Sequence, residues 1–136
     1  MNYLDSLKAA EEFFEAANAA LKVGGLLLFD ISSQYKLENI LGCNTFAEDE
    51  QGGAYIWKNN YDPKSRLIEM NLTFFERQGE LYRRFTERHI QRAHSVDELL
   101  SALNRAGFDA EAYDFETMDP VKPDSERVQF SGRKRR

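Results

Sequence analysis

The sequence has almost no cysteine and no long apolar run, and each absence excludes a class of protein. Cys43 is the one cysteine in 136 residues, so the chain has neither a disulfide framework nor a cysteine-based metal site. This usage fits a reducing cytoplasm. No apolar stretch approaches the roughly 20 residues of a membrane helix, and the amino terminus has no signal-peptide pattern. We therefore predict a cytoplasmic protein without a membrane partner.

The sequence also lacks an excess of positive charge. Its 23 acidic and 18 basic residues give a net charge of -5, which argues against a surface built for nucleic-acid phosphates. The basic cluster at 133–136 is too short to reverse this balance and fits a solvated chain end. Hydrophobic residues make up 42% of the chain, enough to build a core, so we predict one folded domain over 1–136.

The first thirty residues predict a helix and then a buried strand. Asp5 or Ser6 is suited to cap the helix, and Gly24 can take the left-handed conformation that ends one. The run 26–31 is apolar without alternation, which predicts a strand covered on both faces, as in a parallel sheet between helices. The apolar face of the helix follows 3.6-residue spacing: Leu7, Ala10, Phe14, Ala17 and Leu21.

Residues 45–92 alternate between apolar and polar and contain tight-turn signals, which predicts an antiparallel sheet. We expect three clear strands in it, at 54–61, 66–76 and 80–92. The turns between them are expected at 62–65, where Pro63 suits a type I turn, and at 78–79, where Gly79 can take a positive φ.

The charged residues of this sheet suggest its register. If Tyr61 lies opposite Arg66 and Arg77 lies opposite Glu80, three charged residues form one cross-strand row on a solvated face: Lys58, Glu69 and Arg88. A slip of one residue would turn Lys58 and Arg88 into the apolar layer.

The opposite face is mostly apolar but has a polar corner, where Trp57 is accompanied by Asn59, Glu87 and His89. Three interpretations stay open. The polar groups satisfy one another and serve only the fold; they line a pocket and touch a substrate; or the register is wrong. One histidine and one glutamate at alternate positions do not make a ligand set, so we predict no metal site.

After this sheet, Ser95 and Glu98 form a capping box that begins a second helix, and Gly107 ends it. Strands are expected at 110–117 and 127–133, with a loop at 120–125 between them.

Three segments resemble class I S-adenosylmethionine-dependent methyltransferases, in a branch that acts on small molecules. The helix end, two glycines and strand of Leu21–Asp30 resemble the junction before the fifth strand of that family. Met1–Leu4 resembles the tail of the segment after the fourth strand. Ser95–Phe108 resembles the late helix and its glycine exit.

The resemblance implies an α/β fold: the second half of a Rossmann-like methyltransferase sheet with an inserted three- to four-stranded antiparallel lid at 45–92. The last two strands would form an antiparallel hairpin. The family's Gly-x-Gly-x-Gly loop and its acidic ribose ligand are absent from this sequence. We therefore expect no cofactor-binding residue in this chain, S-adenosylmethionine only in the complete enzyme, and no activity of the chain alone.

The implied reaction is methyl transfer to a nitrogen, oxygen or carbon atom of a small molecule, by approximation and orientation. His89 and Glu87 are the candidate bases. The resemblance places Asn2 and Tyr3 beside the reacting group, and Tyr35 follows a strand end of the kind that holds ligands, although it could equally be a core residue. The candidate substrate-binding residues are Asn2, Tyr3, Tyr35, Trp57, Asn59, Glu87 and His89.

Another function stays open: a stand-alone ligand-binding or assembly module that uses the antiparallel sheet. In either case, the uncovered edge of the strand at 26–31 predicts a homo-oligomer, because a free apolar edge invites pairing with another chain.

Overall fold

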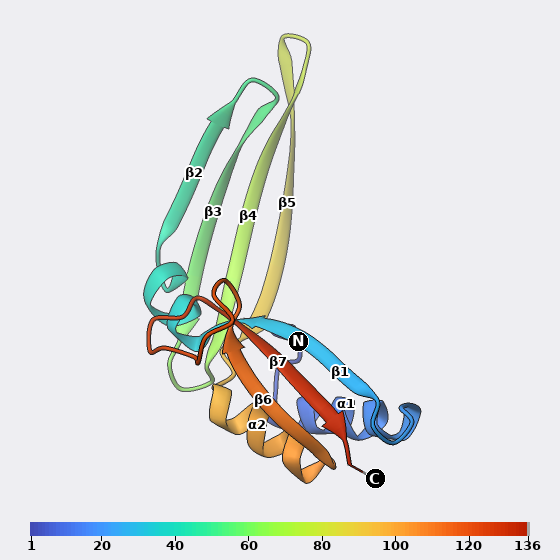
Figure 1. Cartoon of the computed structure of the whole chain (residues 1–136). Coiled ribbons are helices and arrows are strands. Elements are labelled where there is room, and N and C mark those ends of the chain that lie inside the picture. The colour runs from blue at the N-terminus through green and yellow to red at the C-terminus, as the bar shows by residue number, and fades with distance from the viewer. Residues whose placement is uncertain (136) are drawn as a thin grey trace.

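The computed structural model describes residues 1–135 and contains two antiparallel sheets that meet at one end (Figure 1). The first sheet has three strands in the order β1-β7-β6, and the second has four in the order β2-β3-β4-β5. The elements are α1 (Leu7–Ala20), β1 (Leu26–Ser32), the π-helical turn η1 (Lys36–Leu41), β2 (Thr45–Glu50), β3 (Gly53–Asp62), β4 (Leu67–Gln78), β5 (Leu81–Arg92), α2 (Val96–Arg105), β6 (Phe108–Asp114) and β7 (Arg127–Lys134). Arg136, the last residue of the basic cluster at 133–136, lies outside the described residues.

The three-stranded sheet and the two helices form the main core. Phe29 of β1 stacks on Phe130 of β7 with ring centroids 4.9 Å apart, and Phe14 of α1 packs beside Phe29. The hairpin predicted for the last two strands is confirmed, since β6 and β7 pair along their whole lengths. The fully buried members of this core come from both helices and all three strands: Ala10, Phe14, Ile31, Leu99, Ala102, Leu103, Phe108, Val128 and Phe130.

The prediction that β1 is covered on both faces is wrong for this chain. Leu27, Phe29 and Ile31 point into the core, whereas Leu26 and Leu28 are 50% and 62% exposed. The reason is that α1 and α2 pack together against the same face of the sheet. Among the described residues β1 pairs with β7 alone, in antiparallel fashion, and its other edge is free.

The helix ends follow the sequence signals except at the end of α1, which stops at Ala20 with Leu21 as its cap, whereas Gly24 takes φ +81° in the turn beyond it. Ser6 caps α1 by accepting a hydrogen bond from the Ala9 amide at 3.1 Å, and the capping box of α2 is present in both directions. Gly107 after α2 has φ +91°. β6 begins and ends earlier than predicted. It ends early because the Asp114 carboxylate accepts hydrogen bonds from the Glu116 and Thr117 amides, which turns the chain out of the strand.

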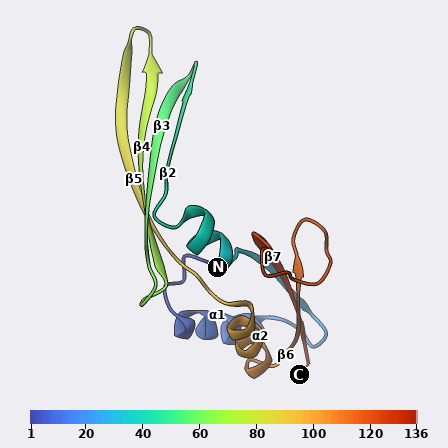
Figure 2. The same cartoon turned by 90° about the vertical axis from the view of Figure 1, so that its left-hand side faces the viewer.

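The four-stranded sheet projects away from the rest of the molecule, and one of its faces is covered at the base by η1 (Figures 1 and 2). We call this the inner face. Leu37 and Leu41 of η1 pack there against Ile68 and Met70, with Trp57 at the margin. Toward the hairpin tips both faces are open, and most side chains of β5 up to Arg88 are exposed.

The predicted register of this sheet is wrong by two residues, while the predicted faces are right. Asp62 lies opposite Leu67, and Lys58 lies opposite Asn71, which in turn faces Arg88. The first turn closes one residue later than predicted, because Arg66 takes a left-handed conformation at φ +59°. The second turn is also one residue late, with Gln78 opposite Leu81.

A shift of two residues preserves the side on which each residue lies. The expected ion pair therefore forms diagonally, with Arg88 donating to Glu69 at 2.9 Å on the outer face. This contact lowers the pKa of the Glu69 carboxyl to about 2. Trp57 and His89 share the inner face, where Trp57, Leu72 and Glu87 form one cross-strand row.

Replacing Trp57 by alanine is expected to lower the free energy of unfolding by about 3 kcal/mol, because the indole packs on Phe46 and on the cluster beneath η1. The neighbouring Lys58→Ala, on the exposed outer face, should change it by less than about 0.5 kcal/mol. Urea unfolding followed by circular dichroism measures both. Equal effects of the two substitutions would show that the inner face is not the packed one.

Candidate functional site

Three of the predicted site residues form a hydrogen-bonded chain on the inner face near the base of the sheet. The Tyr3 hydroxyl lies 3.2 Å from His89 Nδ1, and His89 Nε2 lies 2.9 Å from Glu87 Oε2. The Tyr3 and His89 rings meet edge to face, with centroids 5.9 Å apart. When the hydroxyl donates to Nδ1, the Nε2 proton is donated to the carboxylate. We call this chain the Tyr3–His89–Glu87 relay.

The relay is open to solvent rather than buried. The side chains of His89 and Glu87 are 35% and 50% exposed, and Tyr3 is 60% exposed. Such groups can bind or release a proton without leaving a buried charge unpaired. The geometry therefore suits a proton-accepting role toward a molecule that lies on the inner face.

Asn2 holds the amino-terminal turn in place and so positions Tyr3. Its side-chain amide donates to the carbonyls of Ser32 at 3.0 Å and Arg92 at 3.2 Å, and its carbonyl oxygen accepts from the Ser32 amide at 2.9 Å. The backbone amide of Arg92 donates in turn to the backbone carbonyl of Asn2 at 2.7 Å. Asn2 thus joins the end of β1 to the end of β5, and its polar side-chain atoms are occupied by backbone.

Trp57 and Asn59 lie side by side on the inner face and carry unsatisfied polar atoms. The Trp57 Nε1 donor and the Asn59 Oδ1 acceptor are buried and have no hydrogen-bond partner among the described residues. Asn59 Nδ2 does donate to the Asn44 carbonyl at 3.3 Å. Buried polar groups are normally paired, so these two mark the least satisfied part of the inner face.

Tyr35 is not brought together with the other predicted residues. It begins η1 and lines a cleft of about 360 Å³ at the end of β1, together with Ser33, Ser95 and Lys122. Asp30 at the end of β1 pairs with Arg127. The Ser33 hydroxyl accepts a hydrogen bond from the Lys36 amide at 3.1 Å.

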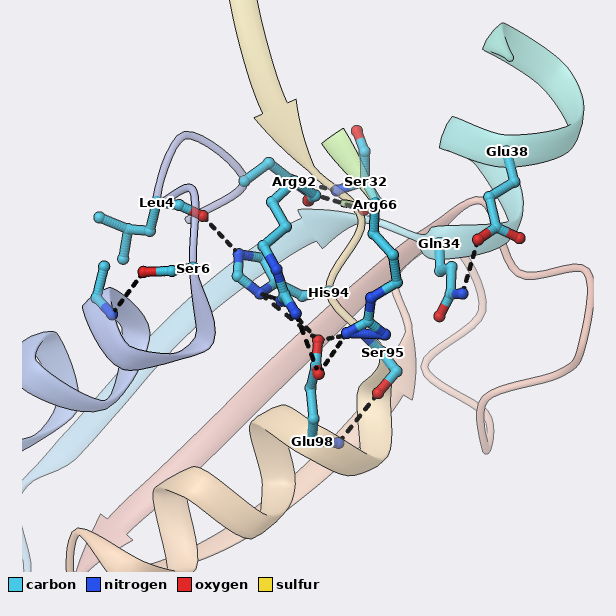
Figure 3. A network of polar contacts seen from close by, with 12 residues as sticks. Leu4, Ser6, Ser32, Gln34, Glu38, Arg66, Arg92, His94, Ser95 and Glu98 are labelled. Carbon is cyan, nitrogen blue, oxygen red and sulfur yellow. Dashed lines mark hydrogen bonds and ion pairs between the residues drawn. The ribbon is translucent and has the colours of Figure 1, made fainter. Parts of the chain in front are cut away.

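A partly buried ionic network that the sequence analysis did not single out joins the two sheets (Figure 3). The Glu98 carboxylate accepts hydrogen bonds from Arg92 at 2.8 Å, from Arg66 at 2.5 Å and from the Ser95 amide at 2.9 Å. Burial alone would raise the pKa of this carboxyl. The hydrogen bonds from Arg92 and the Ser95 amide, with the charges of both arginines, outweigh burial and hold the pKa below its ordinary value.

His94 completes the network and is fully buried. Arg92 can only donate, so His94 Nδ1 accepts from it, and Nε2 donates to the Leu4 carbonyl at 2.9 Å. These partners select the neutral imidazole with its proton on Nε2. Burial first, and then the positive charge of Arg92, lower the pKa of His94 below its ordinary value of 6.5. The capping box was the one signal in the sequence that pointed to this place, through Glu98.

The free amides at the start of α2 are already satisfied by Ser95 and Glu98, so this helix start offers no anion site. No group of three or more metal-ligating side chains occurs in residues 1–135. No helix in the same residues is long and apolar enough to cross a membrane.

Known proteins resemble this chain over almost its whole length. No protein-family model matches it. YqeM of Bacillus subtilis, which is named as a methyltransferase, is 32% identical over 98% of the chain, and the match covers 55% of that protein. A crystal structure of an S-adenosylmethionine-dependent methyltransferase from Clostridium acetobutylicum matches 99% of the chain with a TM-score of 0.91 at 31% identity, and the match covers 55% of that chain.

A more distant similarity shows the fold alone. CalS10, an amino pentose methyltransferase of Micromonospora echinaspora, matches 97% of the chain with a TM-score of 0.72 at 16% identity, and the match covers 53% of CalS10. The chain thus spans about half the length of the relatives that it matches, as the resemblance found in the sequence implied.

The protein is expected to lose stability as the pH falls below about 6.5, before its carboxylates titrate. Unfolded His94 takes up a proton near that pH, whereas the buried imidazole resists it, so the unfolded state binds more protons and unfolding is favoured. Urea unfolding between about pH 7.5 and pH 5 measures this slope. His94→Gln should flatten this slope; equal slopes in the parent and His94→Gln would contradict the assignment.

Proposed function

Because this chain has the fold of about half of an S-adenosylmethionine-dependent methyltransferase, we propose that it is the carboxyl-terminal, substrate-side part of such an enzyme. The observation that carries the proposal is the match of 99% of the chain to one methyltransferase structure at a TM-score of 0.91. In the proposed enzyme S-adenosylmethionine supplies the methyl group, and residues outside this sequence bind it. The four-stranded sheet, 45–92, serves as the lid over the methyl acceptor.

The Tyr3–His89–Glu87 relay is proposed to act on the acceptor. The acceptor atom gives its proton to the Tyr3 hydroxyl oxygen while that hydroxyl passes its own proton to His89 Nδ1, and Glu87, which accepts from Nε2, orients the imidazole and stabilises its charged form. The remaining contribution of the chain is to orient the acceptor against the inner face. Asn2 positions the relay, and the unsatisfied atoms of Trp57 and Asn59 are proposed to meet polar groups of the acceptor.

The proposed acceptor is a small molecule. The inner face provides a few polar groups on an apolar surface, which is the usual character of small-ligand sites. The names of the structurally similar proteins agree, since they include an amino pentose methyltransferase and a sugar N-methyltransferase. Tyr35 lines a separate cleft and is proposed to contact only the far end of a larger acceptor.

The free edge of β1 is the proposed junction with the cofactor-binding part of the fold. An exposed apolar strand edge is a template for another strand, and Leu26 and Leu28 continue the uncovered surface beside it. When no other strand is present, the same edge pairs with a second copy in the predicted homo-oligomer.

The proposed location is the cytoplasm. Cys43 is a free cysteine, which fits a reducing compartment.

The alternative is a binding or assembly module that needs no methyl donor. The lack of a Gly-x-Gly-x-Gly loop in this sequence favours it, and the similarity to methyltransferases disfavours it. The two functions differ in whether the relay affects methyl transfer or only ligand affinity.

His89→Gln, in the chain combined with its cofactor-binding part, is expected to lower kcat by roughly 100-fold with little change in KM, as loss of a general base does. Tyr3→Phe should give a loss in the same direction. The outer-face variant Arg88→Gln serves as the matched control, because Arg88 is next to His89 but points away. Unchanged kcat in His89→Gln would rule out the relay as the base.

The chain alone is expected to show no measurable binding of S-adenosylmethionine or S-adenosylhomocysteine, because the glycine loop and the acidic ribose ligand are absent from its sequence. Isothermal titration calorimetry measures this directly. One-to-one binding with micromolar affinity would overturn the expectation and locate a cofactor site within residues 1–136.

A further inference from the structure

The outer face of the four-stranded sheet carries an apolar patch near the hairpin tips. Ile56 is 36% exposed and Tyr82 is 57% exposed, and both border a groove of about 500 Å³. Ala47, Ala54 and Phe75 complete the apolar lining of this groove. We call these five residues the outer tip patch. It lies on the side opposite to η1 and the proposed substrate face, so the relay does not explain it.

Opposite charges flank the outer tip patch along a single cross-strand row. Asp49 on the edge strand β2 pairs with Ala54, Ala54 with Phe75, and Phe75 with Arg84 on the other edge strand β5. The row therefore reads acidic, apolar, apolar, basic from one edge of the sheet to the other. Neither Asp49 nor Arg84 forms an ion pair with another residue of 1–135.

We propose that the outer tip patch is a dimer interface and that its occupant is the same patch of a second copy of this chain. In this dimer the two outer faces stack on each other, and the two-fold axis lies between them, parallel to the strands. Rotation about this axis places β2 of one copy over β5 of the other. Asp49 of each copy then lies over Arg84 of its partner, and the apolar centres meet. The interface is isologous, so it closes as a dimer.

The charge pattern favours this arrangement over the other ways to join two such sheets. A two-fold axis across the strands would stack β2 on β2 and β5 on β5, bringing like charges together, which is unfavourable. Edge-to-edge pairing of β2 of one copy with β5 of the next also brings opposite charges together. That assembly leaves a free edge at each end, so it forms open chains rather than a closed dimer.

The shape of the molecule leaves room for the dimer. Figure 2 shows η1 and the three-stranded sheet on the other side of the four-stranded sheet, so stacked outer faces keep the two cores apart. The outer face of the four strands, which are 6, 10, 12 and 12 residues long from β2 to β5, covers roughly 600 Å² per copy in total. This is near the lower end for specific dimers, so we expect micromolar self-association.

Charge reversal tests the arrangement. Sedimentation equilibrium of the chain should show a dimer, and Asp49→Arg or Arg84→Asp alone should weaken dimerisation at least about tenfold, because each reversal creates two repulsive contacts. The double variant Asp49→Arg with Arg84→Asp should restore the dimer. The two positions lie at opposite edges of one sheet, so restoration reports contact between copies.

Two controls separate the possible outcomes. Glu48→Arg reverses a charge on β2 that points to the inner face and should leave the dimer intact. Leu28→Lys alters the uncovered face of β1 and should also leave it intact. A monomeric parent chain, a double variant as weak as the single ones, or a dimer lost in Leu28→Lys alone would overturn the proposal. These results do not depend on methyl transfer.

Discussion

The Glu98 carboxylate is the contact on which the arrangement of the two sheets depends. It caps α2 through the Ser95 amide and at the same time accepts hydrogen bonds from Arg92 at the end of β5 and Arg66 at the start of β4. A carboxylate taken out of water is costly unless its lone pairs are filled, and here two guanidinium groups and an amide fill them. Because one group serves both the helix cap and the sheet base, the four-stranded sheet cannot tilt without breaking the start of α2.

A second connection, made by Asn2, positions the residues of the proposed relay. The buried amide joins the last residues of β1 and β5, and the next residue, Tyr3, is thereby held against His89. The relay thus combines one residue from the amino-terminal turn with two from β5, which lie more than eighty residues away. Its geometry depends on the junction between the sheets more than on the local conformation of any strand.

The sequence predicted what is set locally and missed what is set by topology. Ser6, the Ser95 box and Gly107 act within one turn of chain, so the three helix limits that they set were correct. The faces of the four-stranded sheet were also correct, because alternation determines them. The register was not, since Arg66 adopts a left-handed conformation that non-glycine residues rarely take. The pair of Arg66 and Glu98 joins residues 32 apart, and only the completed fold brings them together.

The two histidines show how burial separates structural from chemical roles. His94 has no exposed surface, and both ring nitrogens are fixed by Arg92 and the Leu4 carbonyl, so a proton added to it would face a guanidinium already in contact. His89 is hydrogen-bonded as well, but to a hydroxyl that can donate or accept and to a carboxylate that stabilises a positive imidazole. It also lies on the open inner face. A histidine is therefore neutral and fixed at position 94, in the junction between the sheets, whereas at position 89 it is open to a molecule on the inner face.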